Sequence, residues 1–136
     1  MNNPQSISLI FPLYRDRYTV KIVIDKSLKI LKKLKIKYEI IIIDDFCPEK
    51  SGLVALEYSK KNKKIKVIFH KKNYGYGAAI RTGFKNSKYE CVYAVDGDGE
   101  FGMALNDLPR ILKSYKYNDL VITYRYKKRY KTTRII

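Results

Sequence analysis

The chain has 136 residues, 46% of them hydrophobic, which suits one domain with a buried core and is too short for two. This composition excludes a disordered chain, and no apolar run approaches the roughly 20 residues that a membrane-spanning helix needs. The formal net charge of +16 allows attraction to nucleic acid, anionic lipid or nucleotide phosphates.

The predicted elements alternate between strand and helix. A strand at Ser6–Leu13 precedes a helix at Thr19–Leu34, and the apolar run Glu39–Ile43 is typical of a strand buried on both faces. Then follow a helix near Leu53–Lys61, a strand at Ile65–Phe69, a helix over 76–84, a strand at Glu90–Val95, a helix over 105–115 and a strand at Asp119–Tyr124. Single helices between strands favour an α/β, Rossmann-like fold with a mostly parallel sheet of about five strands.

The organisation is that of a single domain at 1–124 followed by a basic tail at 125–136. The high charge is interpreted first as a solvated, lysine-rich surface and second as attraction to a membrane surface. The polar N-terminus predicts no secretory signal, and Cys47 and Cys91 lack the spacing of a metal site. We therefore expect a cytoplasmic protein, peripheral at the inner face of the membrane if the charge serves that attraction.

Asp96-Gly97-Asp98 follows the apolar run Cys91–Val95, so a buried strand delivers two carboxylates to its C-terminal end. Two such carboxylates repel each other unless a cation lies between them. A hard divalent ion that also binds phosphate oxygens fits this arrangement. The alternative is a turn in which Asp and Gly satisfy only the backbone.

Polar residues follow the other predicted strands as well. In an open parallel sheet, ligands bind outside the carboxyl ends of the strands. For Asp44 and Asp45 a second interpretation stays open, because Asp after a strand often caps the next helix. The residues at these ends are Tyr14, Arg15, Asp16, Asp44, Asp45, His70 to Asn73, Asp96 to Glu100, and Arg125.

Three other motifs are excluded. A calcium-binding EF-hand counted from Asp96 needs glycine and glutamate where Phe101 and Asp107 occur. The Gly75-Tyr76-Gly77 segment lacks the third glycine of a dinucleotide fingerprint and follows the wrong strand, and no phosphate-binding Gly-Lys-Ser/Thr is present.

With these residues in hand, the chain resembles family 2 glycosyltransferases of the GT-A fold, most closely the dolichyl- or polyprenyl-phosphate sugar transferase branch. Five segments carry the resemblance in order: 8–14 (SLIFPLY), 39–45 (EIIIIDD), 73–84 (NYGYGAAIRTGF), 96–101 (DGDGEF) and 119–125 (DLVITYR). It implies metal-assisted, inverting transfer from a UDP- or GDP-sugar donor to an acceptor, with a polyprenyl phosphate at a membrane surface as the expected one.

The resemblance also implies roles for individual residues. Asp98, with Glu100 beside it, would bind Mg²⁺ or Mn²⁺, and Asp96, Asp98 and Arg125 would form the catalytic set. The donor would lie against Pro12, Tyr14, Asp16, Asp44, Asp45, Asn73, Gly77, Arg81, Asp96 and Gly97.

The chain departs from the family in length, since it covers the nucleotide-binding half and an acceptor-binding second half is expected to be missing. A catalytically deficient remnant or fragment that binds a nucleotide-sugar is therefore the alternative function. A nucleic-acid-binding protein is disfavoured, because the thirteen tyrosines are scattered and no nucleic-acid-binding motif occurs.

Overall fold

The structure is a computed structural model that describes residues 4–15, 17–95 and 105–123. In these residues β1 (Ser6–Leu13), β2 (Lys37–Asp44), β3 (Ile65–Phe69) and β4 (Val92–Ala94) form a parallel sheet in the order β3-β2-β1-β4. The helices are α1 (Val20–Leu34), α2 (Ser51–Lys61), α3 (Tyr76–Lys85) and α5 (Leu108–Tyr115). The predicted α/β class and parallel sheet are confirmed.

The predicted fifth strand at Asp119–Tyr124 is wrong over the residues that the structure describes. Residues 119–123 follow α5 without strand structure, and Leu120 and Ile122 are 74% and 78% exposed. Their composition suits a strand, but a strand also needs a neighbour for its backbone hydrogen bonds. In the described part of the chain these residues join no sheet, so the strand count is four.

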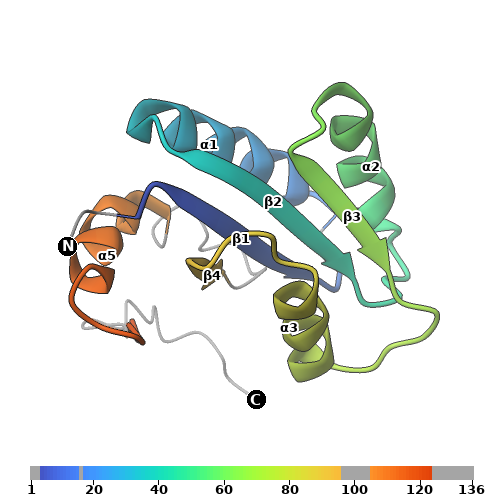
Figure 1. Cartoon of the computed structure of the whole chain (residues 1–136). Coiled ribbons are helices and arrows are strands. Elements are labelled where there is room, and N and C mark those ends of the chain that lie inside the picture. The colour runs from blue at the N-terminus through green and yellow to red at the C-terminus, as the bar shows by residue number, and fades with distance from the viewer. Residues whose placement is uncertain (1–3, 16, 96–104, 124–136) are drawn as a thin grey trace, which may run out of the picture.

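Both faces of the sheet are covered by helices (Figure 1). Ile7, Leu9 and Phe11 of β1 face the larger core cluster, to which α1, α2 and α5 contribute, whereas Ile10 faces a smaller cluster that includes Ala79 of α3. Successive strand residues point to opposite faces, so two buried faces require the continuous apolar runs seen in β1 and β2. Among the described residues, no helix combines the length and the apolar character that crossing a bilayer requires.

Gly83 sets the distance between α3 and the sheet. A Cβ atom on Gly83 would collide with the side chain of Ile10 in β1, whereas a Cβ on Gly77, in the same helix, would meet nothing within 4 Å. Helix α3 therefore packs close enough to β1 that only glycine fits at position 83.

We expect Gly83→Ala to lower the free energy of unfolding by about 1–3 kcal/mol, because the overpacked methyl must displace Ile10 or the helix. Gly77→Ala is the matched control, and it should raise stability by about 0.5–1 kcal/mol because alanine favours the helix. Urea denaturation of the two variants measures both changes. Equal effects of the two substitutions would show that α3 does not press on β1.

Candidate functional site

The carboxyl ends of β1, β2 and β3 meet at one edge of the sheet. Leu13 pairs in register with Asp44, and Asp44 pairs with Phe69. This register brings five residues of the predicted donor site to the same edge: Pro12, Tyr14, Asp44, Asp45 and Asn73. Pro12 is buried within β1, whereas Tyr14 is 43% exposed just beyond it.

The Asp44 carboxylate is buried and fixes the start of α2. Its Oδ1 accepts a hydrogen bond from the backbone N–H of Cys47 at 2.7 Å, and its Oδ2 accepts one from Gly52 at 2.7 Å. Gly52 is the second residue of α2, where backbone N–H groups have no partner inside the helix. A Cβ on Gly52 would lie 2.5 Å from Asp44 Oδ2, so this close approach requires glycine.

Asp45 fixes the loop between β3 and α3. Its Oδ1 lies 2.7 Å from His70 Nδ1 and accepts the backbone N–H of Tyr74 at 2.9 Å, while its Oδ2 accepts the N–H of Gly75 at 2.9 Å. On the other side of the ring, His70 Nε2 lies 2.8 Å from Thr82 Oγ1 in α3. The side chains of Asp45, His70 and Thr82, which we call the Asp45–His70–Thr82 chain, thus connect the end of β2 with α3.

The environment of Asp45 favours its ionised form. Burial by itself raises the pKa of Asp45, but the hydrogen bonds from His70, Tyr74 and Gly75 outweigh burial, and the pKa lies below its ordinary value of 3.8. A carboxylate that accepts several hydrogen bonds stays charged because each bond stabilises the anion. Asp45 is therefore an anion already surrounded by donors of the protein itself.

Cys47 joins the loop after β2 to the loop after β1. Its Sγ accepts the backbone N–H of Arg15 at 3.0 Å and lies 3.0 Å from Ser51 Oγ. Burial raises the pKa of the Cys47 thiol, but the hydrogen bonds with Ser51 and with the backbone of Ser51, Arg15 and Glu49 bring it below its ordinary value. The two loops that would flank a ligand are thus held against each other.

The remaining predicted residues lie on or beside α3, or outside the described residues. The Oδ1 of Asn73 accepts the N–H of Gly75 at 3.0 Å, Gly77 lies in the first turn of α3, and Arg81 is exposed next to Thr82. Within the described ranges no group of three His, Cys, Asp or Glu residues could hold a metal ion. Six predicted site residues lie outside those ranges: Asp16, Asp96, Gly97, Asp98, Glu100 and Arg125.

Sequence reasoning placed His70 among the polar residues at the strand ends but gave neither it nor Thr82 an individual role. His70 is the only histidine of the chain, and it directly follows a strand whose carboxyl end was expected to carry ligand-binding residues. That position indicates that His70 lies at the site, but it does not reveal its bond to Asp45. Its pairing with Thr82 has no such signal, because it depends on how α3 packs against the sheet.

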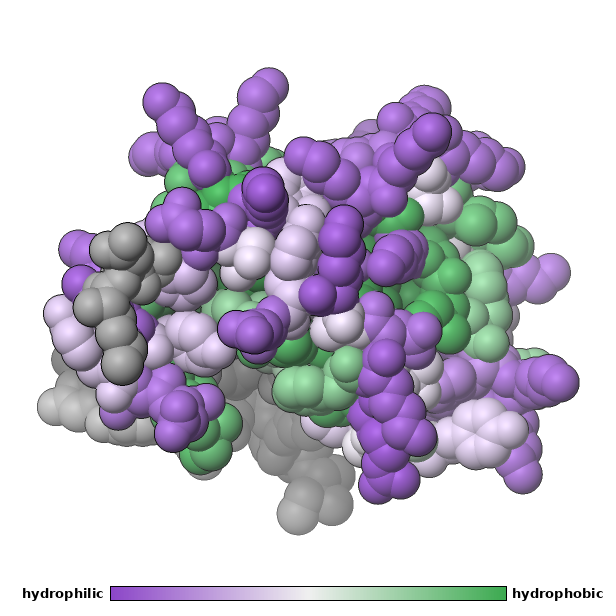
Figure 2. Space-filling model, in the orientation of Figure 1, coloured by the Kyte–Doolittle hydropathy of each residue, from purple (hydrophilic) through white to green (hydrophobic). Residues whose placement is uncertain are grey.

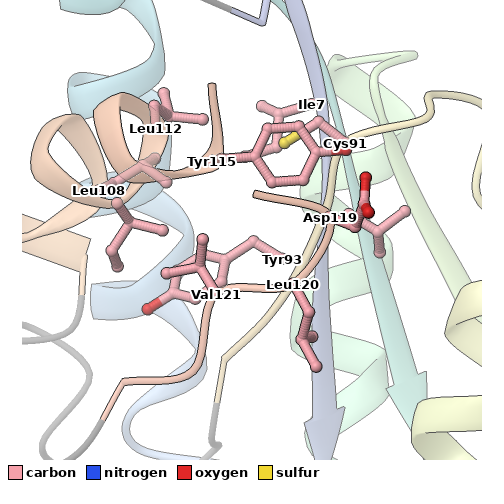
Figure 3. Close-up of a pocket in the computed structure, with 11 residues that line it drawn as sticks. Ile7, Cys91, Tyr93, Leu108, Leu112, Tyr115, Asp119, Leu120 and Val121 are labelled. Atoms are coloured by element: carbon pink, nitrogen blue, oxygen red, sulfur yellow. The ribbon is translucent and has the colours of Figure 1, made fainter. Parts of the chain in front are cut away.

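A hollow between β4 and α5 lies away from these residues (Figure 3). It is lined mainly by apolar and aromatic side chains such as Ile7, Leu108 and Tyr115, with Asp119 at its side. Burial raises the pKa of the Cys91 thiol in its wall to about 11, so this thiol stays neutral. Such a lining offers little to hold a diphosphate, and the polar edge of the sheet is the better candidate site.

Comparison with known proteins decides the family. The family model described as "Glycosyl transferase family 2" matches residues 8–136, which include the carboxyl ends of all four described strands and leave out only the first two residues of β1. The chain belongs to glycosyl transferase family 2. The predicted resemblance is thereby confirmed.

Curated relatives in family 2 include lipid-phosphate sugar transferases. The chain is 32% identical over 125 residues to the dolichyl-phosphate beta-glucosyltransferase of Dictyostelium discoideum, covering 85% of this chain and 38% of the relative. It is 31% identical over 102 residues to the Homo sapiens protein of the same name, covering 70% of this chain and 32% of the relative. The chain therefore spans about a third of the length of the curated relatives it matches.

Solved structures of GT-A glycosyltransferases share the fold of this chain. Staphylococcus aureus TarS 1–349 in complex with UDP-GlcNAc superposes with a TM-score of 0.61 at 22% identity, covering 82% of this chain and 32% of TarS. The mannosyltransferase PcManGT from Pyrobaculum calidifontis, in complex with GDP-Man and Mn²⁺, gives 0.58 at 15% identity, covering 79% of this chain and 32% of that one. At these identities the likeness concerns the fold.

Proposed function

We propose that this chain binds a UDP- or GDP-sugar and serves in transfer of the sugar to a polyprenyl phosphate. The observation that carries the proposal is the family 2 match over residues 8–136. The edge formed by Tyr14, Asp44, Asp45 and Asn73 supports it, since ligands of open parallel sheets bind at this edge. The names of the relatives, dolichyl-phosphate and undecaprenyl-phosphate transferases, support the acceptor class.

In the proposed reaction an oxygen of the acceptor phosphate attacks the anomeric carbon of the donor sugar. The bond from that carbon to the diphosphate breaks with inversion, and its electron pair leaves with the nucleoside diphosphate. An acceptor phosphate is already anionic, so no protein base is needed to activate it. The first two strand ends would position the base and ribose, and the Asp45–His70–Thr82 chain would hold the loop at 73–75 in place for the donor.

The carboxylates of Asp98 and Glu100 supply the hard oxygen donors that Mg²⁺ and Mn²⁺ prefer, so these residues would hold the ion, with Asp96 and Arg125 beside the reacting groups. When bound, the ion supplies Lewis-acid stabilisation of charge on the leaving diphosphate.

Binding of the donor without transfer is the second candidate function. The edge formed by Tyr14, Asp44, Asp45 and Asn73 favours it, because the resemblance assigns these residues to the donor. In that case the edge binds the nucleotide-sugar and no sugar is transferred.

Calorimetric titration with UDP-sugars and GDP-sugars, with and without Mn²⁺, tests the proposed donor site. We expect Asp98→Ala to weaken Mn²⁺-dependent binding by more than about tenfold, the equivalent of losing one charge-assisted interaction of about 1.4 kcal/mol. Asp107→Ala removes an exposed carboxylate before α5 and should leave affinity unchanged.

Sugar transfer to an added polyprenyl phosphate separates the two candidate functions. Turnover supports the transferase, and Mn²⁺-dependent binding without turnover supports the binding protein. If no nucleotide-sugar bound at all, both would be wrong.

A further inference from the structure

Exposed hydrophobic side chains gather beside the candidate site. Tyr14 follows Leu13, which pairs with Asp44, and Phe69 pairs with Asp44 from the other side. Leu53 follows Gly52, whose backbone N–H binds the Asp44 carboxylate. Figure 2 shows hydrophobic surface exposed among hydrophilic side chains over the region of β3 and α2. The apolar rim, as we name it, consists of Tyr14, Phe46, Leu53 and Phe69, which are 43%, 61%, 48% and 46% exposed.

Phe46 has a backbone conformation that bulky residues rarely adopt. Its φ is +59°, in the left-handed region, where a bulky L-residue is an outlier. Both neighbours are fixed, because the Asp45 side chain accepts three hydrogen bonds and the N–H of Cys47 binds Asp44. Such a conformation persists only where the surroundings determine it, and here it leaves the ring exposed to solvent.

Basic side chains lie near these aromatic residues. Arg15 and Lys50 are exposed and also have positive φ, so three of the four non-glycine residues with positive φ in the described chain lie at this edge. The guanidinium carbon of Arg15 lies 5.4 Å from the Tyr14 ring centroid, and Lys72 Nζ lies 5.2 Å from that of Tyr74. Asp44 and Asp45 are buried, so they do not offset this surface charge with exposed carboxylates.

We propose that the apolar rim, with Arg15, Lys50 and Lys72, docks the carboxyl edge of the sheet onto a bilayer rich in anionic headgroups. Aromatic side chains are enriched at the headgroup level of a membrane, and basic residues are attracted to its negative surface potential. The net charge of +16 has the matching sign. The inference rests on the proposed function: a polyprenyl phosphate resides in a membrane, and this docking turns the donor edge toward it.

Sedimentation with vesicles tests the docking surface. We expect binding to vesicles of equal phosphatidylglycerol and phosphatidylcholine, and little binding to phosphatidylcholine alone. Lys50→Asn should lower the partition coefficient about fivefold, which corresponds to about 1 kcal/mol for one basic residue near an anionic surface. Phe46→Asn should lower it by at least as much. Asparagine tolerates positive φ, so both variants should keep or gain thermal stability, whereas a structural role of the Phe46 ring would make Phe46→Asn less stable.

Two matched controls lie elsewhere on the molecule. Lys35→Asn removes an exposed lysine with φ +54° after the C-terminal end of α1. Tyr117→Asn removes an aromatic ring that is 73% exposed and lies 5.1 Å from Lys116 Nζ, beyond α5. Neither should change vesicle binding by more than about twofold, since neither lies at the carboxyl edge.

Equal losses in the controls, or equal binding to both kinds of vesicle, would overturn the inference. Tighter binding to single-stranded RNA than to anionic vesicles, unaffected by Phe46→Asn, would overturn it as well. The nucleotide-sugar titration is independent of lipid, so binding of the donor without binding to vesicles would refute the docking surface and leave the proposed function standing.

Discussion

Asp44→Ala should lower the free energy of unfolding by about 3–6 kcal/mol, because two hydrogen bonds to a buried carboxylate are each worth about 1.5–3 kcal/mol. Both bonds, from Cys47 and Gly52, measure 2.7 Å, and their loss leaves buried N–H groups without acceptors. Urea denaturation measures the change.

Asp25→Ala is the control for Asp44→Ala. Asp25 also accepts a hydrogen bond, from Tyr58 Oη at 3.0 Å, but at the surface of the molecule. Its loss should cost less than about 1 kcal/mol, because water replaces an exposed partner. If Asp44→Ala stayed within about 1 kcal/mol of the wild type yet lost donor affinity, the carboxylate would act chiefly as a ligand.

His70→Ala should weaken nucleotide-sugar affinity by about tenfold or more, because it loosens the loop at 73–75. A tenfold loss corresponds to about 1.4 kcal/mol of binding free energy. Without the ring, Asp45 loses its bond to His70 and α3 loses the bond through Thr82, so the loop carrying Asn73 is held less firmly. Titration at a temperature where the variant remains folded measures the effect.

Conservative variants divide the contribution of His70 between its two hydrogen bonds. His70→Asn can place a donor near the position of Nδ1 and should rescue much of the affinity, whereas His70→Gln reaches toward Thr82 and should rescue less. Thr82→Val tests the outer bond alone and should have the smallest effect. If both replacements of His70 behaved like His70→Ala, the ring would act by packing and the hydrogen bonds would be incidental.

Acid unfolding gives a further expectation for Asp45. Because its pKa is below 3.8 in the folded protein, Asp45 contributes stability that is present above that value and is lost as the pH falls through the lower, folded pKa. Asp45→Asn should therefore show a smaller decrease in unfolding free energy below pH 3.8 than the wild type. Parallel acid-dependence curves for the two proteins would contradict the role given to its hydrogen bonds.

The sequence predicts most of the fold, because a strand buried on both faces is a continuous apolar run that can be recognised in the local sequence. The bounds of β1 and β3 agree with the prediction, and the apolar run in β2 needed only extension at each end. The strand expected at Asp119–Tyr124 failed over its described residues, because pairing depends on a neighbour that no local pattern reveals.

The location of the candidate site could be predicted from the sequence, but most of the hydrogen bonds within it could not. Parallel topology alone brings Tyr14 and Asp44 to one edge. That Asp44 and Asp45 bind backbone N–H groups of distant loops, and that His70 meets Thr82, follows from the packing of α2 and α3. The helix-capping interpretation of Asp44 came closest, since Asp44 does bind the first turn of the next helix.

The position of β1 in the sheet has a consequence for biosynthesis. Of the four described strands β1 is made first, yet it lies between β2 and β4, and its bonds toward β4 join Ser8 to Cys91 and Ile10 to Val95. At a translation rate of about 5–20 residues per second, those partners follow β1 by roughly 4 to 17 seconds. During that time one edge of an eight-residue, largely apolar strand has no partner from its own chain. Among the four described strands, β1 is thus the one whose second neighbour is synthesised last.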